Sequence, residues 1–206
     1  MTQTTKREKR ASPANPRVTQ PVKRGVAGEP GAAGGPPEDS GRLDSLLGLF
    51  VHELRDTYNA EQQLITALPK MAELAEDQEL ATAVREHLEQ TRGQLRRLDQ
   101  IFASLNVSPK GIKCAGMAGI LDEGKELIGK DLPGSVRDAA LIAGGQRVEH
   151  YEMAAYGTLR AYAEQLGLHD AADLLDETLQ EEGAADVRLS RLAERRINAG
   201  AMQGVA

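Results

Sequence analysis

Four potential metal-ligating side chains interrupt the apolar faces of predicted helices in this sequence. Around Glu149, steps of three, four or seven residues reach Ile142, Gly145, Met153 and Tyr156, so the carboxylate shares an apolar helical face. Burying a carboxylate is costly unless positive charge meets it, and a metal ion commonly supplies that charge in helical bundles. One such residue occurs in each of four long amphipathic segments. The predicted metal ligands are Glu61, His87, Glu149 and Glu182.

Further residues along the same segments could add ligands or hydrogen-bond to them. They are Glu53, Gln90, Gln146, His150, Glu152, Glu181 and Asp186. Several carboxylates with one or two imidazoles form the donor set of a carboxylate-bridged pair of metal ions, which suits iron or manganese. The Glu-x-x-His pattern of such sites is incomplete, because Val84 stands three residues before His87 and Gln146 three before Glu149. The sequence assigns no catalytic residue.

A metal-free interpretation of the same residues stays open. A single buried glutamate is more often paired with an arginine or histidine than with a metal, and Arg147 is placed to pair with Glu152. Tyr58 and Tyr156 fit the core with hydrogen-bonded hydroxyls. Cys114 fits it as a small apolar side chain. The inward carboxylates would then serve only the stability of the fold.

Four long helices are needed to bring the candidate ligands together. Apolar residues recur at a helical period in four segments, and Leu and Ala dominate, as in helix-rich proteins. The predicted helices run from an N-cap at Asp39 or Ser40 to Met71, from Gln78 to Leu105, from Ser135 to Leu166 and from Asp170 to Ile197. Pro69 is expected to kink the first helix or end its regular part, and Gly167 to stop the third in the left-handed conformation.

The connections between these helices indicate the fold class. We predict a turn at 106–111, a short helix at 114–128 and a loop at 130–134. A connection of roughly 28 residues between the second and third long helices can run the length of a bundle, as it does in ferritin-like folds. The prediction is therefore all-α, a ferritin-like four-helix bundle with a short extra helix in the long crossover. Its domain would span 41–198, with a frayed end at 199–206.

Charge and composition separate an N-terminal tail from this bundle. Residues 1–40 are rich in Pro, Gly, Lys and Arg, which predicts a disordered basic tail. They carry a net charge of +3, from seven Lys or Arg and four Asp or Glu, which leaves −9 for the rest of a chain whose net charge is −6. An acidic bundle argues against nucleic acid as a partner, except weakly through the tail.

The remaining composition favours a soluble, cytoplasmic protein. Cys114 is the only cysteine, so an intramolecular disulfide is excluded. No apolar run approaches the roughly 18 residues of a membrane-spanning helix. The basic N-terminus has no apolar segment behind it and does not resemble a secretory signal.

Five motifs in chain order resemble the bacterial YciE/YciF stress proteins. They are LFVHELRDTY (49–58), EHLEQT (86–91), QRVEHYE (146–152), AYGTLR (155–160) and TLQEE (178–182). The resemblance covers about residues 43–195 and leaves out the basic tail. It implies a ferritin-like bundle, often paired into homodimers, with a two-metal site.

The resulting hypothesis is a ferritin-like stress-response protein that binds a di-iron or di-manganese centre. It could detoxify peroxide or oxygen, or oxidise the bound metal, as a peroxidase-like, catalase-like or ferroxidase-like enzyme. The alternative is a metal-free, non-enzymatic bundle that binds partners through a second apolar stripe at Leu46, Leu64, Leu74 and Leu88. Protection of DNA through the basic tail is a third hypothesis.

Overall fold

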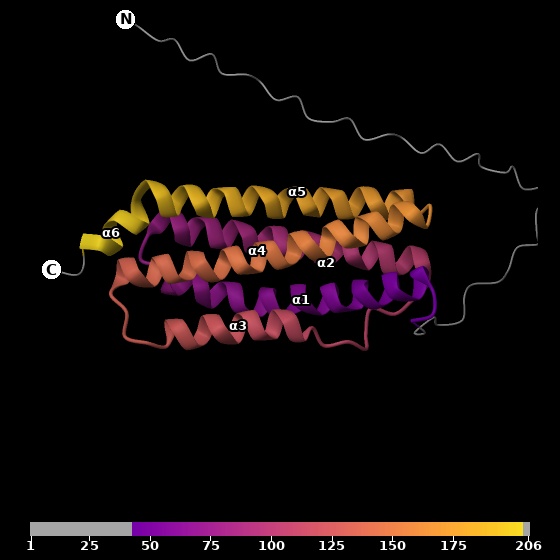
Figure 1. Ribbon diagram of the computed structural model, residues 1–206, viewed down its shortest axis with the longest axis horizontal. Helices are drawn as coiled ribbons and strands as arrows, with labels where there is room; N and C mark the ends of the chain where they lie inside the picture. The colour runs from indigo at the N-terminus through magenta and orange to yellow at the C-terminus, as the bar shows by residue number, and fades with distance from the viewer. Residues whose placement is uncertain (1–42, 204–206) are drawn as a thin grey trace, which may run out of the picture. The chain divides into compact units, whose positions relative to one another are not determined.

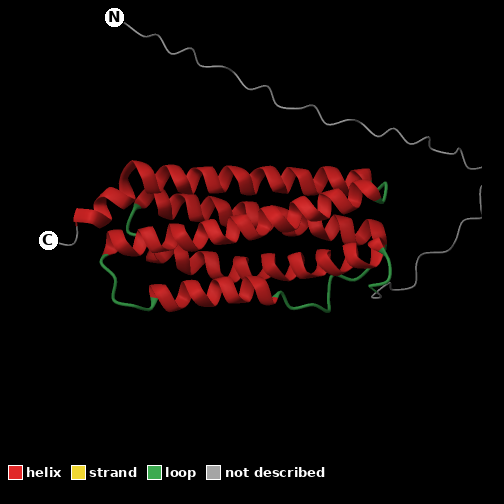
Figure 2. Cartoon of the chain, viewed as in Figure 1, coloured by secondary structure: helices red, strands yellow, loops and turns green. Residues whose placement is uncertain are grey.

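The computed structural model describes residues 43–203, and every regular element in that range is helical (Figure 2). The elements are α1 (Leu46–Leu74), α2 (Gln78–Leu105), α3 (Ala115–Ile128), α4 (Gly134–Gln165), α5 (His169–Leu192), the π-helix η1 (Ala193–Ile197) and α6 (Asn198–Gln203). The predicted bounds of the second long helix agree with α2, and those of the short helix and the third long helix differ from α3 and α4 by one residue at most.

The start of the first helix is set by a different cap from the one predicted. Ser45 is the N-cap of α1, and its hydroxyl accepts a hydrogen bond from the Gly48 backbone N–H at 3.0 Å. The predicted caps Asp39 and Ser40 lie outside the described residues. Leu43, which the predicted apolar stripe included, is 61% exposed, so the buried face begins after it.

Local sequence signals set other helix ends as expected. The Asp77 side chain caps α2 by accepting hydrogen bonds from the backbone N–H groups of Glu79 and Leu80 at 2.9 and 3.0 Å. Gly167 follows α4 with a φ of +72°, the left-handed conformation predicted for it. Pro69 does not end α1, which continues as a regular helix beyond it.

Two helical hairpins and one long crossover form a four-helix bundle (Figure 1). Residues 75–77 join α1 to α2, and residues 166–168 join α4 to α5. The crossover between the hairpins, 106–133, carries α3 along the outside of the bundle, where it packs on α1 and α4. The described part of the chain therefore has the predicted fold: an all-α, ferritin-like four-helix bundle with a short extra helix in the long crossover.

The core consists of two apolar clusters, one toward each end of the bundle. One cluster contains Leu64 and Val84, and the other contains Leu54 and Leu98. Buried polar residues of all four long helices occupy the sequence positions between the two clusters. Leu64 is 0% exposed, so the second, exposed apolar stripe of the metal-free hypothesis is wrong at this position.

The C-terminal end is more regular than the sequence suggested. The last long helix continues through η1 into α6, where a frayed segment had been expected from residue 199. Ile197 is buried in the core, which ties η1 to the bundle. Among residues 43–203, no helix is long and apolar enough to cross a membrane.

Candidate metal centre

Four buried side chains from three of the long helices lie close together at one point in the bundle. His87 comes from α2, Glu149 and Glu152 from α4, and Glu182 from α5. One ligand atom of each lies within 4.8 Å of the corresponding atoms of the other three. Two ligands of one ion lie within about twice a bond of roughly 2.0–2.4 Å, so this spacing fits a common metal ion closely.

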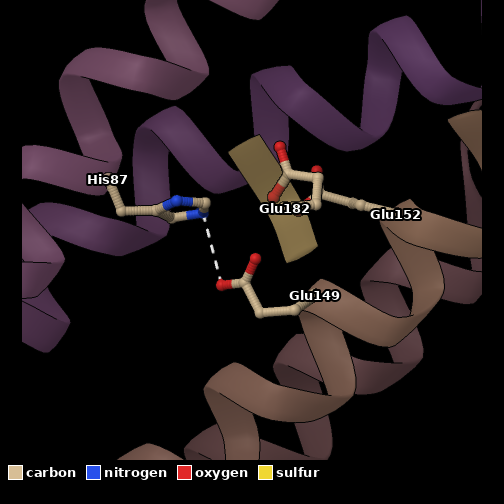
Figure 3. A group of neighbouring side chains, drawn as sticks. All are labelled: His87, Glu149, Glu152 and Glu182. Atoms are coloured by element: carbon tan, nitrogen blue, oxygen red, sulfur yellow. Dashed lines mark ion pairs between the residues drawn. The ribbon is translucent and has the colours of Figure 1, made fainter. Parts of the chain in front are cut away.

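The four side chains point into a shared space (Figure 3). The imidazole of His87 faces the carboxylate of Glu149, with 3.5 Å between Nε2 and Oε1. Glu152 lies one helical turn after Glu149 on α4 and reaches the same space, toward Glu182. None of the four side chains belongs to a residue more than 7% exposed, so solvent does not compensate their charges.

Glu61 of α1 borders this group. Tyr156 of α4 donates its hydroxyl hydrogen bond to Oε1 of Glu61, and both residues are fully buried. The charge of Glu182 raises the pKa of Glu61, and the charge of Glu61 in turn raises the pKa of Glu152. The centre thus holds four carboxyl groups and one imidazole, with a contribution from every long helix.

Hydrogen bonds satisfy only part of this polar cluster. Gln94 donates to Oε1 of Glu182 and to Oε2 of Glu181, the latter at 3.1 Å. Several buried atoms have no hydrogen-bond partner within the described residues: Oε2 of Glu61, Glu149 and Glu182, both oxygens of Glu152, and both ring nitrogens of His87. Unsatisfied buried acceptors are rare in folded proteins, and here they converge. Carboxylate oxygens and imidazole nitrogens are ligand atoms that suit a divalent metal ion such as iron or manganese.

Burial and mutual repulsion raise the pKa of all four carboxyls. Burial, reinforced by the charge of Glu182, raises the pKa of Glu61 to about 8. Burial and the facing Glu182 raise that of Glu149 to about 10, and burial raises that of Glu182 to about 7. The pKa of Glu152 also lies well above its ordinary value, first through burial and then through the charge of Glu61. Without metal, therefore, most of these carboxyls hold protons at neutral pH.

Burial acts in the opposite direction on His87. It lowers the pKa of the imidazole, which is consequently neutral at pH 7. A neutral imidazole is the form that binds a metal. The salt-bridge alternative for this cluster requires a charged histidine, and burial disfavours that form.

An arginine supports the site from outside. The Arg97 guanidinium of α2 bonds Glu181 at 2.7 and 2.8 Å and also pairs with Glu177. Because Gln94 bridges Glu181 and Glu182, this network fixes the carboxylate of Glu182 in place. It links α2 to α5 at the level of the centre. Metal ligands are commonly oriented by such hydrogen-bonded neighbours.

The other residues suggested by the sequence have separate places. His150 is exposed and lies 3.3 Å from Asp186, on the flank of α4. Gln146 donates to the Ser190 hydroxyl at 2.8 Å, away from the four. Gln90 lies on the surface side of His87.

Glu53 and Arg147 also lie outside the group. Glu53 is half-buried on α1 and is not among the clustered residues. Arg147 lies 3.8 Å from Glu123 of α3, so the predicted pairing of Arg147 with Glu152 is wrong. Within residues 43–203 Glu152 therefore has no arginine partner, which removes one metal-free explanation of the cluster.

Glu152 and Gln94 are closer to the centre than the sequence indicated. Glu152 had been predicted only as a possible additional ligand, and Gln94 had not been predicted as part of the site. The i,i+3 spacing from Glu149 puts Glu152 about 60° around the helix, which lets both carboxyls reach one cavity. The spacing of Gln94 from His87, seven residues or about two turns, gave the same signal.

Comparison with known proteins identifies the family. The family model described as "Domain of unknown function (DUF892)" matches residues 45–202. This chain belongs to the DUF892 family. The match spans the four long helices, α3 and all of the clustered residues.

Individual DUF892-type proteins support this assignment. The chain is 49% identical to the protein YciF of Escherichia coli strain K12 over 157 residues, 76% of this chain and 95% of that one. The crystal structure of the E. coli stress protein YciF matches with a TM-score of 0.73 and 47% identity, covering 76% of this chain and 99% of that chain. A structure of YcfI from Rhodopseudomonas palustris matches with a TM-score of 0.70 and 44% identity, covering 72% and 94%. The resemblance to the YciF-type stress proteins is thereby confirmed.

Proposed function

We propose that this chain binds two iron or manganese ions between its four long helices and serves in protection against oxidative stress. The buried, unpartnered cluster of His87, Glu149, Glu152 and Glu182, with Glu61 beside it, carries this proposal. Four ionised carboxylates balance the charge of two divalent ions, so metal would replace the protons that the cluster otherwise needs. Carboxylates and one imidazole favour iron or manganese by ligand hardness.

Such a pair of ions would supply reduction of hydrogen peroxide or dioxygen, or dismutation of hydrogen peroxide. Reduction of hydrogen peroxide takes two electrons and two protons and gives two waters. Dioxygen would accept two electrons and two protons to give hydrogen peroxide. In dismutation, two hydrogen peroxide molecules give two waters and one dioxygen. The residues of this chain hold the ions, exclude bulk water and, through Tyr156, fix the carboxyl of Glu61.

Elemental analysis tests this proposal most directly. Full-length protein purified without chelators should hold about two iron or manganese ions per chain, the count of a two-metal centre. The double variant Glu149→Gln/Glu182→Gln should lose them and keep its helical circular dichroism. Glu89→Gln, an exposed residue of α2, is the matched control and should keep the metal. The proposal would be contradicted if the wild-type protein took up no metal after anaerobic loading with iron and with manganese.

A second candidate function is partner binding without metal. It is supported by a cavity of about 620 Å³ between α1, α3 and α4, lined mainly by apolar side chains such as Met71, Ile120 and Val148.

The homodimer implied by the family resemblance is also part of the proposal. Sedimentation velocity would measure it.

A further inference from the structure

A smaller cavity connects the candidate centre with the protein surface. It has a volume of about 140 Å³ and is bounded by α1, α2, α4 and α5. His87 and Glu149, both buried, line it on the inside. Gln90 and Ala184, both exposed, line it as well. This cavity is therefore a passage between solvent and two of the candidate ligands.

The walls of the passage are apolar and narrow. Ala83, Val84, Ala185 and Leu189 supply small or aliphatic side chains, and Gly145 supplies only backbone. A Cβ atom at Gly145 would lie 3.0 Å from Cδ1 of Leu189, closer than ordinary van der Waals contact, so even one methyl group would need a shift there. Apolar walls favour uncharged molecules over ions, which would lose their hydration.

An ion pair on the passage wall is compatible with this selectivity. Arg188 of α5 lines the passage and forms an ion pair with Glu86 of α2. Because this pair is electrically neutral, it leaves no unpaired carboxylate there to attract a metal cation into the passage. The passage is thus better suited to the entry of a neutral reactant than to the entry of a metal ion.

Size limits that reactant further. Sites for drug-sized ligands measure roughly 300–1,000 Å³. A passage of about 140 Å³ is far smaller and holds only molecules comparable to a few waters.

We propose that this passage between α2 and α5 delivers an uncharged oxidant of two oxygen atoms, hydrogen peroxide or dioxygen, to the metal centre and excludes bulkier organic hydroperoxides. The inference rests on the proposed function and deepens it by assigning the class of substrate and its route. The residues that determine it are the small side chains of the wall, Ala83 and Ala185, together with Gly145 and Leu189.

The test fills the passage while leaving the candidate ligands unchanged. Ala185→Phe places a ring in the wall, and Ala154→Phe, at an exposed position of α4, is the matched control. Both variants are made in the full chain and loaded anaerobically with ferrous iron. Nitric oxide, an uncharged diatomic probe, is mixed with each protein, and the rise of its absorption band gives the association rate. Iron content and circular dichroism accompany every measurement, and hydrogen peroxide replaces nitric oxide in a parallel series.

We expect Ala185→Phe to slow both nitric oxide association and peroxide-driven oxidation by at least about tenfold, with full iron content, because the reactant must wait for the wall to open. Ala154→Phe should react like the wild type. In the wild type, tert-butyl hydroperoxide should react at least about tenfold more slowly than hydrogen peroxide, and Leu189→Ala, which widens the wall, should reduce that difference. A parallel series with dioxygen as oxidant shows which of the two oxidants reacts.

Two results would overturn the inference alone: unchanged rates in an iron-loaded Ala185→Phe, or equal rates for the two hydroperoxides in the wild type. If Ala185→Phe fails to fold, the hydroperoxide comparison in the wild type and in Leu189→Ala decides the matter. A wild-type chain that binds no iron overturns the proposed function and this inference together.

Discussion

At the scale of single residues, the buried carboxyls make the stability of the metal-free protein depend on pH. Their pKa values in the folded protein, about 7 for Glu182, about 8 for Glu61 and about 10 for Glu149, all exceed the ordinary value near 4.5. Above pH 4.5 the unfolded chain therefore holds fewer protons on these groups than the folded one, so stability falls as pH rises toward those values. Burial lowers the pKa of His87, so this group makes stability rise with pH, but only below about pH 6.5.

We accordingly predict that the chelator-treated protein loses stability between pH 6.5 and 9. The free energy of unfolding should fall by about 1.4 kcal/mol per pH unit for each carboxyl that stays protonated in the folded state. Over this pH range the loss amounts to several kcal/mol in total. Urea denaturation followed by circular dichroism measures it. Glu149→Gln should flatten the dependence, because a neutral amide replaces a carboxyl whose pKa is raised to about 10, and Glu89→Gln should not. A midpoint that stays constant or rises over this range would contradict the argument.

Residue types and helical spacing were enough to predict that His87, Glu149 and Glu182 converge, but not how each side chain is used. Glu149, His87 and Glu182 stood out because a charge on an apolar face demands a partner. His150 could not be judged from spacing alone, since a residue 100° from Glu149 can turn inward or outward. In the structure it lies outward, 3.3 Å from Asp186. The pairing of Arg147 with α3 depends on the path of the crossover, which no local pattern specifies.

At the scale of elements, one aspartate holds the start of α4 against the first hairpin. Asp138 is 3% exposed, and its carboxylate accepts hydrogen bonds from the backbone N–H groups of Glu76 and Asp77 at 3.0 and 2.8 Å. Glu76 lies in the connection between α1 and α2, and Asp77 is the N-cap of α2. Backbone N–H groups at the start of a helix have no partner within the helix and need another acceptor. The contact joins the two hairpins at one end of the bundle.

Replacing this carboxylate should therefore destabilise the bundle without touching the candidate centre. Asp138→Ala leaves two buried or partly buried N–H groups without an acceptor and should cost about 2–4 kcal/mol of unfolding free energy. Asp138→Asn should cost less, because its carbonyl oxygen can still accept one of the bonds. Asp131→Ala, at an exposed loop position, is the control. Equal urea midpoints for Asp138→Ala and Asp131→Ala would show that the contact contributes nothing.

Helix interiors were more predictable than helix starts, for a physical reason. The apolar period runs through a whole helix, whereas a start depends on which of several nearby side chains caps the first turn. Asp39, Ser40 and Ser45 are all capable of capping by type, and the structure shows Ser45 doing so. The continuation of the last helix through η1 into α6 likewise depends on tertiary contacts, since Ile197 packs in the core.

At the scale of the whole molecule, a metal bound between all four long helices should act as a cross-link. Binding to the folded state alone stabilises it by about 2.7 kcal/mol per site at a free metal concentration 100 times the dissociation constant. For a domain of this size that corresponds to a rise in Tm of roughly 5–10 °C per site. Adding manganese to chelator-treated, dialysed protein in a calorimeter tests this. Glu149→Gln/Glu182→Gln should show no rise, and a similar rise in that variant would place the metal elsewhere.

The distribution of the cluster over both hairpins also bears on how the protein is made. Glu61 and His87 are synthesised with the first hairpin, Glu149 and Glu152 with the start of the second, and Glu182 after all of them. Domains begin to fold from the N-terminal side during synthesis. A growing chain that has formed only the first hairpin has one carboxylate and one imidazole of the set, too few to retain a metal. On the proposed function, metal capture would therefore wait until translation has passed residue 182, and an incomplete chain would carry no bound ion.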